Sequence, residues 1–159
     1  MIFSNHRSFL DAASGAAWKR LGVSRRAGVL APLFSIRSKK SAGVGEFPDL
    51  ELLADWCREC GMSLIQLLPL NDVGTRFCPY DAESSFALDP MHLALEPLAA
   101  PGGGPAVEIK KLRARYRSDK PYFDTRIKRD KLALLRRVFA ERRKQGSEEF
   151  ARFKDSQVY

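Results

Sequence analysis

Two apolar runs decide the fold of this chain: GVLAPLF at residues 28–34 and SLIQLLPL at residues 63–70. Each is a short continuous apolar segment with turn residues beside it, which is typical of a strand buried on both faces. Between them lie a loop rich in Ser, Gly and Lys, residues 35–45, and a helix over residues 48–60 that stops before Gly61. The order strand, loop, helix, strand with a short helix-to-strand connection predicts a right-handed β-α-β unit in a parallel sheet, and therefore an α/β fold.

Predicted helices lie on both sides of this unit. Residues 8–21 carry an apolar stripe that starts at a candidate N-cap, residues 124–144 carry a longer one, and a last helix follows Ser147. Three consecutive glycines at residues 102–104 are typical of a flexible connection. These features divide the chain into four predicted segments: an N-terminal extension with a short helix (residues 1–27), the β-α-β portion and its following loop (residues 28–98), a flexible linker (residues 99–121) and a basic helical subdomain (residues 122–159).

Length and composition restrict the class of protein. The chain has 159 residues, of which 45% are hydrophobic and 29% charged, which is enough apolar material for a packed core. No apolar run approaches the roughly 18–20 residues that a membrane-spanning helix needs, and the start of the chain lacks the pattern of a secretory signal. Three cysteines are too few for a disulfide framework. We therefore expect a soluble, cytoplasmic globular protein without a membrane partner.

The positive charge is concentrated in the second half of the chain. Residues 110–159 hold seventeen Lys or Arg against seven Asp or Glu, within a formal net charge of +8 for the whole chain. Clustered cations gain binding energy from phosphates by releasing counterions, so nucleic-acid binding is one alternative interpretation. The acidic residues are mixed among the basic ones along predicted exposed helix faces, however, and no reading element is recognisable. We expect no nucleic-acid partner.

The pair Cys57 and Cys60 has the spacing of a redox or metal motif. A zinc site would need two further ligands, and only Cys78, His6 and His92 could supply them. Both cysteines of the pair also fall on the apolar stripe of the helix over residues 48–60, where small apolar side chains belong. We expect structural cysteines, incidental histidines, no metal site and no cofactor.

The loop after the second strand, residues 71–90, is the candidate ligand-binding segment, because α/β proteins bind ligands beyond the carboxyl ends of their parallel strands. Its aromatic residues are the most informative feature. Tyr80 is open to two interpretations: stacking on the apolar face of a sugar, or anchoring the loop to the core. For Phe77 and Phe86 we expect core anchoring. Sequence spacing alone establishes no pair for acid/base chemistry among the carboxylates of the segment, which are typical turn residues: Asp72, Asp81, Glu83 and Asp89.

Several ordered blocks of the chain together resemble one known family. They cover roughly residues 28–98 and are similar to the opening of bacterial amylomaltases, the 4-α-glucanotransferases that disproportionate maltodextrins. The matching blocks are GVLAPLFS (residues 28–35), GVGEFPDL (residues 43–50), SLIQLLPLNDVG (residues 63–74) and PYDAESSFALDP (residues 79–90). The helical pattern of residues 122–153 is similar to the helical insertion of the same family.

This resemblance implies a (β/α)₈ TIM barrel with inserted subdomains. It also implies cofactor-free transfer of an α-1,4-glucan segment with retention of configuration, by a carboxylate nucleophile, a carboxylic acid/base and a third, stabilising Asp. The tyrosine of the family's Pro-Tyr pair lies in the substrate cleft, so Tyr80 is the first substrate-binding candidate. Cys78 stands where the family often has a sugar-contacting Ser, and Asp81 and Ser84 are neighbours in the same motif.

The chain differs from the family pattern in length. A (β/α)₈ barrel takes about 250 residues, and this chain matches only the first two strands, their helix and the helical insertion. The family's catalytic carboxylates come from later strands, so we expect no catalytic residue here. The chain is thus predicted to be a truncated N-terminal portion, inactive alone, with α-1,4-glucans and the missing C-terminal part of the barrel as its partners. A glucan-binding or complementing module that needs a second chain is the main alternative, and a basic nucleic-acid-binding protein is the other.

Overall fold

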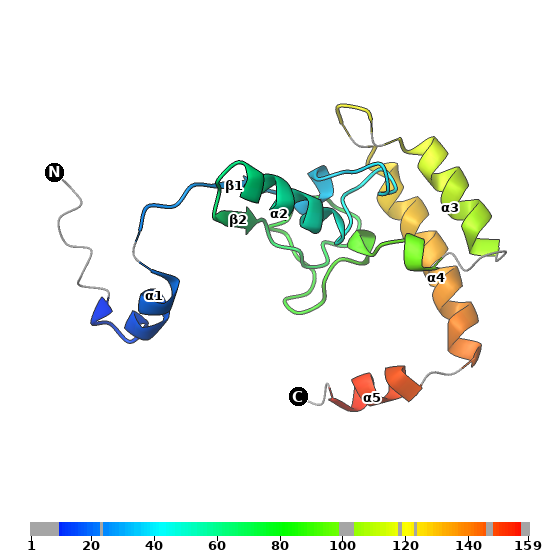
Figure 1. Cartoon of the computed structure of the whole chain (residues 1–159). Helices are drawn as coiled ribbons and strands as arrows, with labels where there is room; N and C mark the ends of the chain where they lie inside the picture. Colours follow the sequence, from blue (N-terminus) through cyan, green and yellow to red (C-terminus); the bar gives the residue numbers. More distant parts are fainter. Residues whose placement is uncertain are drawn as a thin grey trace.

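The structure is a computed structural model that describes residues 10–22, 24–98, 104–117, 119–122, 124–145 and 148–156. Within these ranges a two-stranded sheet and five α-helices are joined by loops and single 3₁₀ turns (Figure 1). In chain order the helices and strands are α1 (Gly15–Leu21), β1 (Gly28–Ala31), α2 (Asp49–Glu59), β2 (Leu64–Leu67), α3 (Gly104–Arg115), α4 (Arg126–Gln145) and α5 (Glu148–Ser156). The 3₁₀ turns are η2 (Leu33–Ser35), η3 (Pro90–His92) and η4 (Glu96–Leu98).

The β-α-β unit predicted from the sequence is confirmed. Strands β1 and β2 pair in parallel, with Gly28 opposite Leu64 and Ala31 opposite Leu67, and α2 connects them. Both strands are shorter than predicted. After β1 comes Pro32, which has no backbone N–H to continue the ladder, and the chain turns into η2. Helix α2 covers one face of the sheet (Figure 1).

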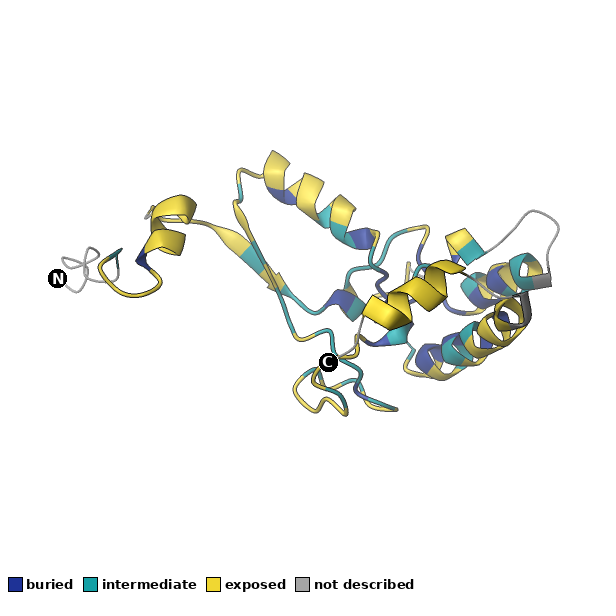
Figure 2. Cartoon of the chain, turned by 90° about the horizontal axis from the view of Figure 1, so that it is seen from below, coloured by how far each residue is buried: buried dark blue, intermediate teal, exposed yellow. Residues whose placement is uncertain are grey.

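The hydrophobic core does not lie on the sheet, in contrast to the prediction of two buried strands. Burial alternates along both strands between exposed and intermediate, and Leu30 and Leu64 are 58% and 49% exposed. The exposed residues of both strands share one face of the sheet, which no further element covers (Figure 2), and both sheet edges are unpaired. The core lies instead where the loop before α2 and η3 meet α3 and α4: Ala42, Val44, Met91, Leu95, Ile109, Leu112, Tyr116, Ile127, Leu134 and Val138.

The prediction of a flexible linker over residues 99–121 is wrong for the stretch that forms helix α3. Twelve of these residues form a helix, which packs beside α4 and runs in the opposite direction (Figure 1). Its inner face buries Ile109 and Leu112, followed by Tyr116 just beyond the helix end. These buried residues recur at a spacing of three and four, as in a helix. The sequence prediction instead gave weight to the glycines and proline at the start of the segment, although proline is well tolerated in a first helical turn. The remaining glycines of the run lie outside the described residues.

The terminal helices are peripheral. Helix α1 starts at Gly15 rather than at residue 8, and it lies apart from the other elements (Figure 1); the predicted N-cap Ser8 lies outside the described residues. Helix α5, at the other end, contacts α4 through an edge-to-face pair of Phe139 and Phe150, whose ring centroids are 6.2 Å apart.

Helix α4 nearly matches its predicted range of residues 124–144. The Asp124 carboxylate accepts the N–H of Arg126 at 3.0 Å and so caps the first turn of the helix.

Candidate functional site

The loop after β2 is closed at its base by backbone hydrogen bonds. Asn71 and Leu88 form an antiparallel bridge, and the N–H of Asp72 donates to the Ala87 carbonyl at 2.8 Å. One step further along the loop, the N–H of Glu83 donates to the Asp72 carbonyl, also at 2.8 Å. These bonds bring residues on both sides of the loop together, so the segment between them projects as one unit from the carboxyl ends of the strands.

Three of the predicted site residues share one turn of this loop. The N–H of Asp81 donates to the Cys78 carbonyl at 3.1 Å, and Tyr80 stands between them with 75% of its surface exposed. An ion pair between Asp81 and Arg76 spans the same turn. Ser84 has a different local role, because its Oγ accepts the N–H groups of Phe86 and Ala87 at 3.3 and 2.9 Å. The turn therefore presents the Tyr80 ring and the Cys78 side chain outward.

The aromatic residues of the loop behave differently from one another. Phe77 is an anchor, as predicted: it packs edge-to-face on Phe34 at 6.1 Å and contacts the core. The same prediction is wrong for Phe86, which is 82% exposed. Of the two interpretations of Tyr80, core anchoring does not agree with its exposure, which leaves its ring and hydroxyl available to a ligand.

A buried lysine from α4 holds the base of this loop. Lys128 is 2% exposed, and its ammonium lies 2.5 Å from Asp89 Oδ2, 3.4 Å from the Arg76 carbonyl and 5.8 Å from the centre of the Phe77 ring. Asp72 Oδ1 is 3.9 Å away. One cation from the helical subdomain thus contacts both ends of the loop. Sequence reasoning missed this role by placing the basic residues of this helix on exposed faces.

A second buried lysine lies one turn further along α4. Lys131 is fully buried, and its ammonium lies 2.6 Å from Oε1 of Glu46, which is itself 4% exposed. Burial lowers the pKa of Lys131, an effect that the neighbouring Glu46 carboxylate opposes. The same Oε1 accepts the N–H of Ala42 at 3.3 Å. Lys128 and Lys131 are three residues apart, and the apolar residues Ile127 and Leu134 on either side of them are buried as well. From this helical spacing the sequence could have predicted that both lysines lie on the inner face of the helix.

Of the three cysteines only Cys57 is buried, and it and the buried histidine have structural surroundings. Cys57 is buried as predicted, whereas Cys60, expected on the same inner stripe, is exposed at the end of α2. His92 is not incidental: its Nδ1 donates to the Gly45 carbonyl at 2.9 Å, and burial lowers its pKa. Among the residues that the structure describes, no group of three or more His, Cys, Asp or Glu side chains is placed to hold a metal ion. None of the described helices is both long and apolar enough to cross a membrane.

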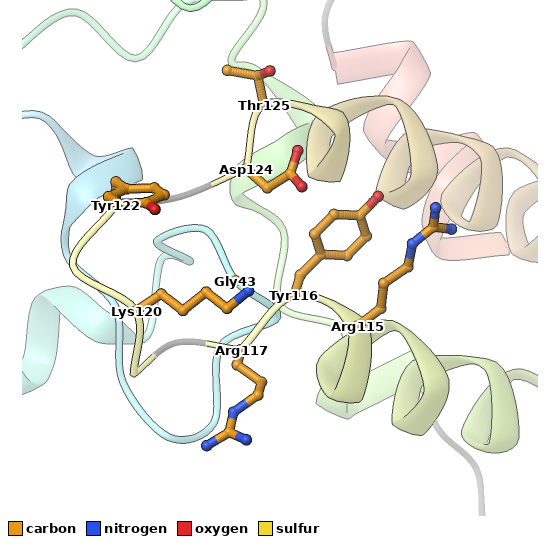
Figure 3. A pocket seen from close by; sticks show the side chains of 8 residues that line it. All are labelled: Gly43, Arg115, Tyr116, Arg117, Lys120, Tyr122, Asp124 and Thr125. Atoms are coloured by element: carbon orange, nitrogen blue, oxygen red, sulfur yellow. The ribbon is translucent and has the colours of Figure 1, made fainter.

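A separate cavity of about 290 Å³ opens beside the connection between α3 and α4 (Figure 3). It lies on the helical part of the molecule, and none of the residues that line it belongs to the turn that carries Tyr80. Its walls combine basic, aromatic and hydroxyl side chains with one carboxylate and one glycine: Gly43, Arg115, Tyr116, Arg117, Lys120, Tyr122, Asp124 and Thr125.

The fold and the loop define an α/β protein with a candidate ligand site beyond the carboxyl ends of its parallel strands. A family model described as 4-alpha-glucanotransferase matches residues 31–159. The chain therefore belongs to the 4-alpha-glucanotransferase family, in agreement with the resemblance of its sequence blocks.

Individual relatives agree with the family model. A 4-alpha-glucanotransferase of Chlamydia pneumoniae is 41% identical over 151 residues, which are 92% of this chain and 28% of that protein. One of Chlamydia trachomatis is 42% identical over 93 residues, or 58% of this chain and 18% of that protein. One of Oryza sativa subsp. japonica is 40% identical over 123 residues, or 72% of this chain and 13% of that protein. This chain thus corresponds to less than a third of each of these relatives.

Proposed function

We propose that this chain supplies part of a 4-α-glucanotransferase that transfers α-1,4-glucan segments between maltodextrins with retention of configuration. The family match over residues 31–159 carries this proposal. In it, β1 and β2 are the first two strands of a (β/α)₈ barrel, and the helices α3 to α5 belong to an inserted subdomain. The reaction needs no cofactor. A cytoplasmic location remains a prediction from the sequence.

The Tyr80 turn is the proposed contribution of this chain to the substrate cleft. An exposed tyrosine in the loop that follows a parallel strand offers an apolar ring to a sugar face and a hydroxyl to its oxygen atoms. Cys78, Asp81 and Ser84 are its proposed neighbours in substrate binding. The ion pair of Asp81 with Arg76 and the use of Ser84 Oγ by backbone N–H groups make them secondary to Tyr80.

Three of the four carboxylates near this turn are already engaged, which supports a catalytic machinery outside this chain. Asp89 is 1% exposed and pairs with Lys128, and Asp81 pairs with Arg76. Asp72 accepts the N–H of Gly74 at 2.9 Å. Retaining glucan chemistry needs a nucleophile and an acid/base about 5–5.5 Å apart, both free to reach the sugar. We therefore propose that the chain alone is inactive and that the remaining strands supply these groups.

The exposed faces of the β-α-β unit support a partner that completes the barrel. Leu30 and Leu64 on the strands are exposed, and so are Leu52 and Trp56 on α2, at 56% and 49%. Apolar surface of this kind next to two unpaired strand edges is suited to further strands and helices. A complementing module that binds glucans only with a second chain is the alternative proposal, and the same surface favours it.

Complementation tests the proposed function. The purified chain is incubated with maltotriose, alone and mixed with a polypeptide of the Chlamydia pneumoniae relative that lacks the region matched here. We expect no glucose release from either part, and release of glucose and longer maltodextrins from the mixture. Turnover by the chain alone would place the catalytic groups within it and overturn the proposal.

Two variants then locate the contribution of the loop. Tyr80→Ala in the active mixture is expected to lower kcat/KM by about tenfold to a hundredfold, since a positioning contact with substrate is lost. Phe86→Ala is the matched control, because Phe86 is equally exposed on the same loop but lies outside the Pro-Tyr motif. Equal losses for the two variants would contradict a specific role for Tyr80.

A further inference from the structure

Lys128 on α4 contacts the chain at the point where the Tyr80 turn begins. Its ammonium lies 3.4 Å from the Arg76 carbonyl oxygen and 5.8 Å from the centre of the Phe77 ring. These two residues directly precede the turn over residues 78–81. The lysine itself is 2% exposed, so it lies too deep to touch a glucan. A single side chain from the helical part thus faces the entry to the proposed substrate-binding turn.

Arg76 extends this contact to the far end of the turn. Its carbonyl faces Lys128, whereas its guanidinium forms an ion pair with Asp81. The N–H of Asp81 donates to the Cys78 carbonyl at 3.1 Å, which closes the turn on itself. Tyr80 lies within this closed segment, so a displacement of the Arg76 backbone is expected to move the tyrosine with the rest of the turn.

Phe77 fixes the entry to the turn by a second contact. Its ring packs edge-to-face on Phe34 in η2, just after β1, with 6.1 Å between the ring centroids. The Lys128 ammonium lies over the same Phe77 ring, within the roughly 6 Å range of a cation–π contact. The residue before the turn is therefore held both by the end of β1 and by α4.

Asp89 holds the Lys128 ammonium in place. Its Oδ2 lies 2.5 Å from the ammonium, and its Oδ1 accepts the N–H of Met91 at 3.0 Å. The N–H of Asp89 donates to the Leu70 carbonyl at 2.9 Å, just beyond β2. Asp89 is 1% exposed, and charge-assisted hydrogen bonds of a buried pair are short and directional. The position of the ammonium is thus defined relative to the strand ends.

We propose that Lys128 is a positioning residue for glucan binding, which sets the place of the Tyr80 ring through Arg76 and Phe77. The inference rests on the proposed function of the Tyr80 turn and adds a role for α4 to it. A helix outside the β-α-β unit determines how the chain presents its substrate-binding tyrosine.

Two double variants separate this role from a general effect on stability. Asp89→Asn/Lys128→Met, the Lys128 pair variant, removes both charges of the buried pair together, and the Asn side-chain oxygen can still accept the Met91 N–H. Glu46→Leu/Lys131→Met, the Lys131 pair variant, is the matched control. It removes a buried pair one turn further along the same helix, which engages the loop before α2 instead. Circular dichroism verifies that both variants keep the fold.

Fluorine NMR of the purified chain, labelled with fluorotyrosine, tests the positioning without any glucan transfer. The Tyr80 resonance is assigned from its loss in Tyr80→Phe. We expect the Lys128 pair variant to shift and narrow this resonance, because the turn gains freedom, and the Lys131 pair variant to leave it in place. Phe77→Leu keeps an apolar anchor but removes the ring that Lys128 faces, and it should act in the same direction. A Tyr80 resonance unchanged by both the Lys128 pair variant and Phe77→Leu, or changed equally by all three variants, would overturn the proposal.

Kinetics of the active mixture test the consequence for the substrate. The Lys128 pair variant is expected to raise KM for maltotriose about fivefold with a smaller effect on kcat, because a misplaced Tyr80 weakens the contact with the sugar. In the Tyr80→Ala background the same change should have almost no further effect, since the contact that Lys128 positions is already absent. Equal increases of KM in both backgrounds would show that Lys128 acts by another route, and the proposal would fail. An inactive mixture would overturn only the proposed function, because the Tyr80 resonance still decides whether Lys128 positions the turn.

Discussion

Lys131 Nζ on α4 lies 2.6 Å from Glu46 Oε1 in the loop before α2, and both side chains are buried. The two residues are 85 positions apart in the sequence, and their pair joins the β-α-β part of the chain to the helical part. The backbone N–H of Ala42 also donates to Glu46 Oε1 at 3.3 Å, so the loop itself holds this carboxylate as well. The position of the helical subdomain thus depends on a buried charge in the loop.

Breaking this pair from either side is expected to destabilise the chain strongly. Glu46→Gln or Lys131→Met leaves one buried charge without a partner, which typically costs about 3–5 kcal/mol of unfolding free energy. The double variant Glu46→Leu/Lys131→Met removes both charges of the pair together and is expected to recover most of the loss. Urea unfolding followed by circular dichroism measures these differences.

The exposed pair of Arg58 and Asp55 is the control for this series. Its atoms are 2.9 Å apart, but the side chains are 78% and 57% exposed. Asp55→Asn is expected to change the unfolding free energy by less than about 1 kcal/mol. A loss for Asp55→Asn as large as that for Glu46→Gln would contradict the role of burial.

Lys128→Met is expected to loosen the loop that carries Tyr80. The substitution leaves the buried Asp89 carboxylate without its cation, and the contact with the Arg76 carbonyl is lost. Hydrogen exchange of the Asp72 and Glu83 amides, which close the loop base, should accelerate about tenfold or more relative to the core. Arg129→Met on the exposed side of α4 should leave their exchange unchanged; acceleration by both variants alike would argue against the Lys128 contact.

The sequence predicts the β-α-β unit and the site loop because their signals are local. Apolar runs, helix spacing and turn residues specify β1, α2 and β2, and the Pro-Tyr motif points to Tyr80. The core position could not be predicted in this way, since it depends on which surfaces remain uncovered when only two strands pair. The buried lysines were missed for a related reason: a lysine that pairs with a carboxylate far along the chain has the same local pattern as an exposed one.

A comparison of two glycines separates steric contact from backbone strain. Gly43 and Gly61 have similar φ angles, +74° and +71°, but a Cβ at Gly43 would lie 2.5 Å from Tyr116 Cβ, whereas a Cβ at Gly61 meets nothing within 4 Å. Gly61→Ala is expected to cost about 1 kcal/mol of unfolding free energy for its conformation alone. Gly43→Ala is expected to cost about 2–4 kcal/mol, because Tyr116 must also move. Equal costs measured by urea unfolding would show that the contact with Tyr116 is not a constraint.

The stability of the chain is expected to fall between pH 7.5 and pH 5 in part through His92. Burial lowers the pKa of His92 in the folded protein below its ordinary value of 6.5, so the folded chain takes up the proton less readily than the unfolded chain. Because the unfolded state binds more protons in this window, the contribution of His92 is complete above about pH 6.5 and is lost as the pH falls toward the folded pKa.

The variant His92→Gln isolates this effect. A glutamine amide can still donate to the Gly45 carbonyl that now accepts from Nδ1 at 2.9 Å, but it does not titrate. Urea unfolding at a series of pH values should therefore show a smaller loss of unfolding free energy between pH 7.5 and 5 for His92→Gln than for the unsubstituted chain. The carboxylates titrate in both proteins, so the difference between the two pH profiles reports His92 alone. Identical profiles would assign the acid sensitivity to those carboxylates and exclude His92 as its source.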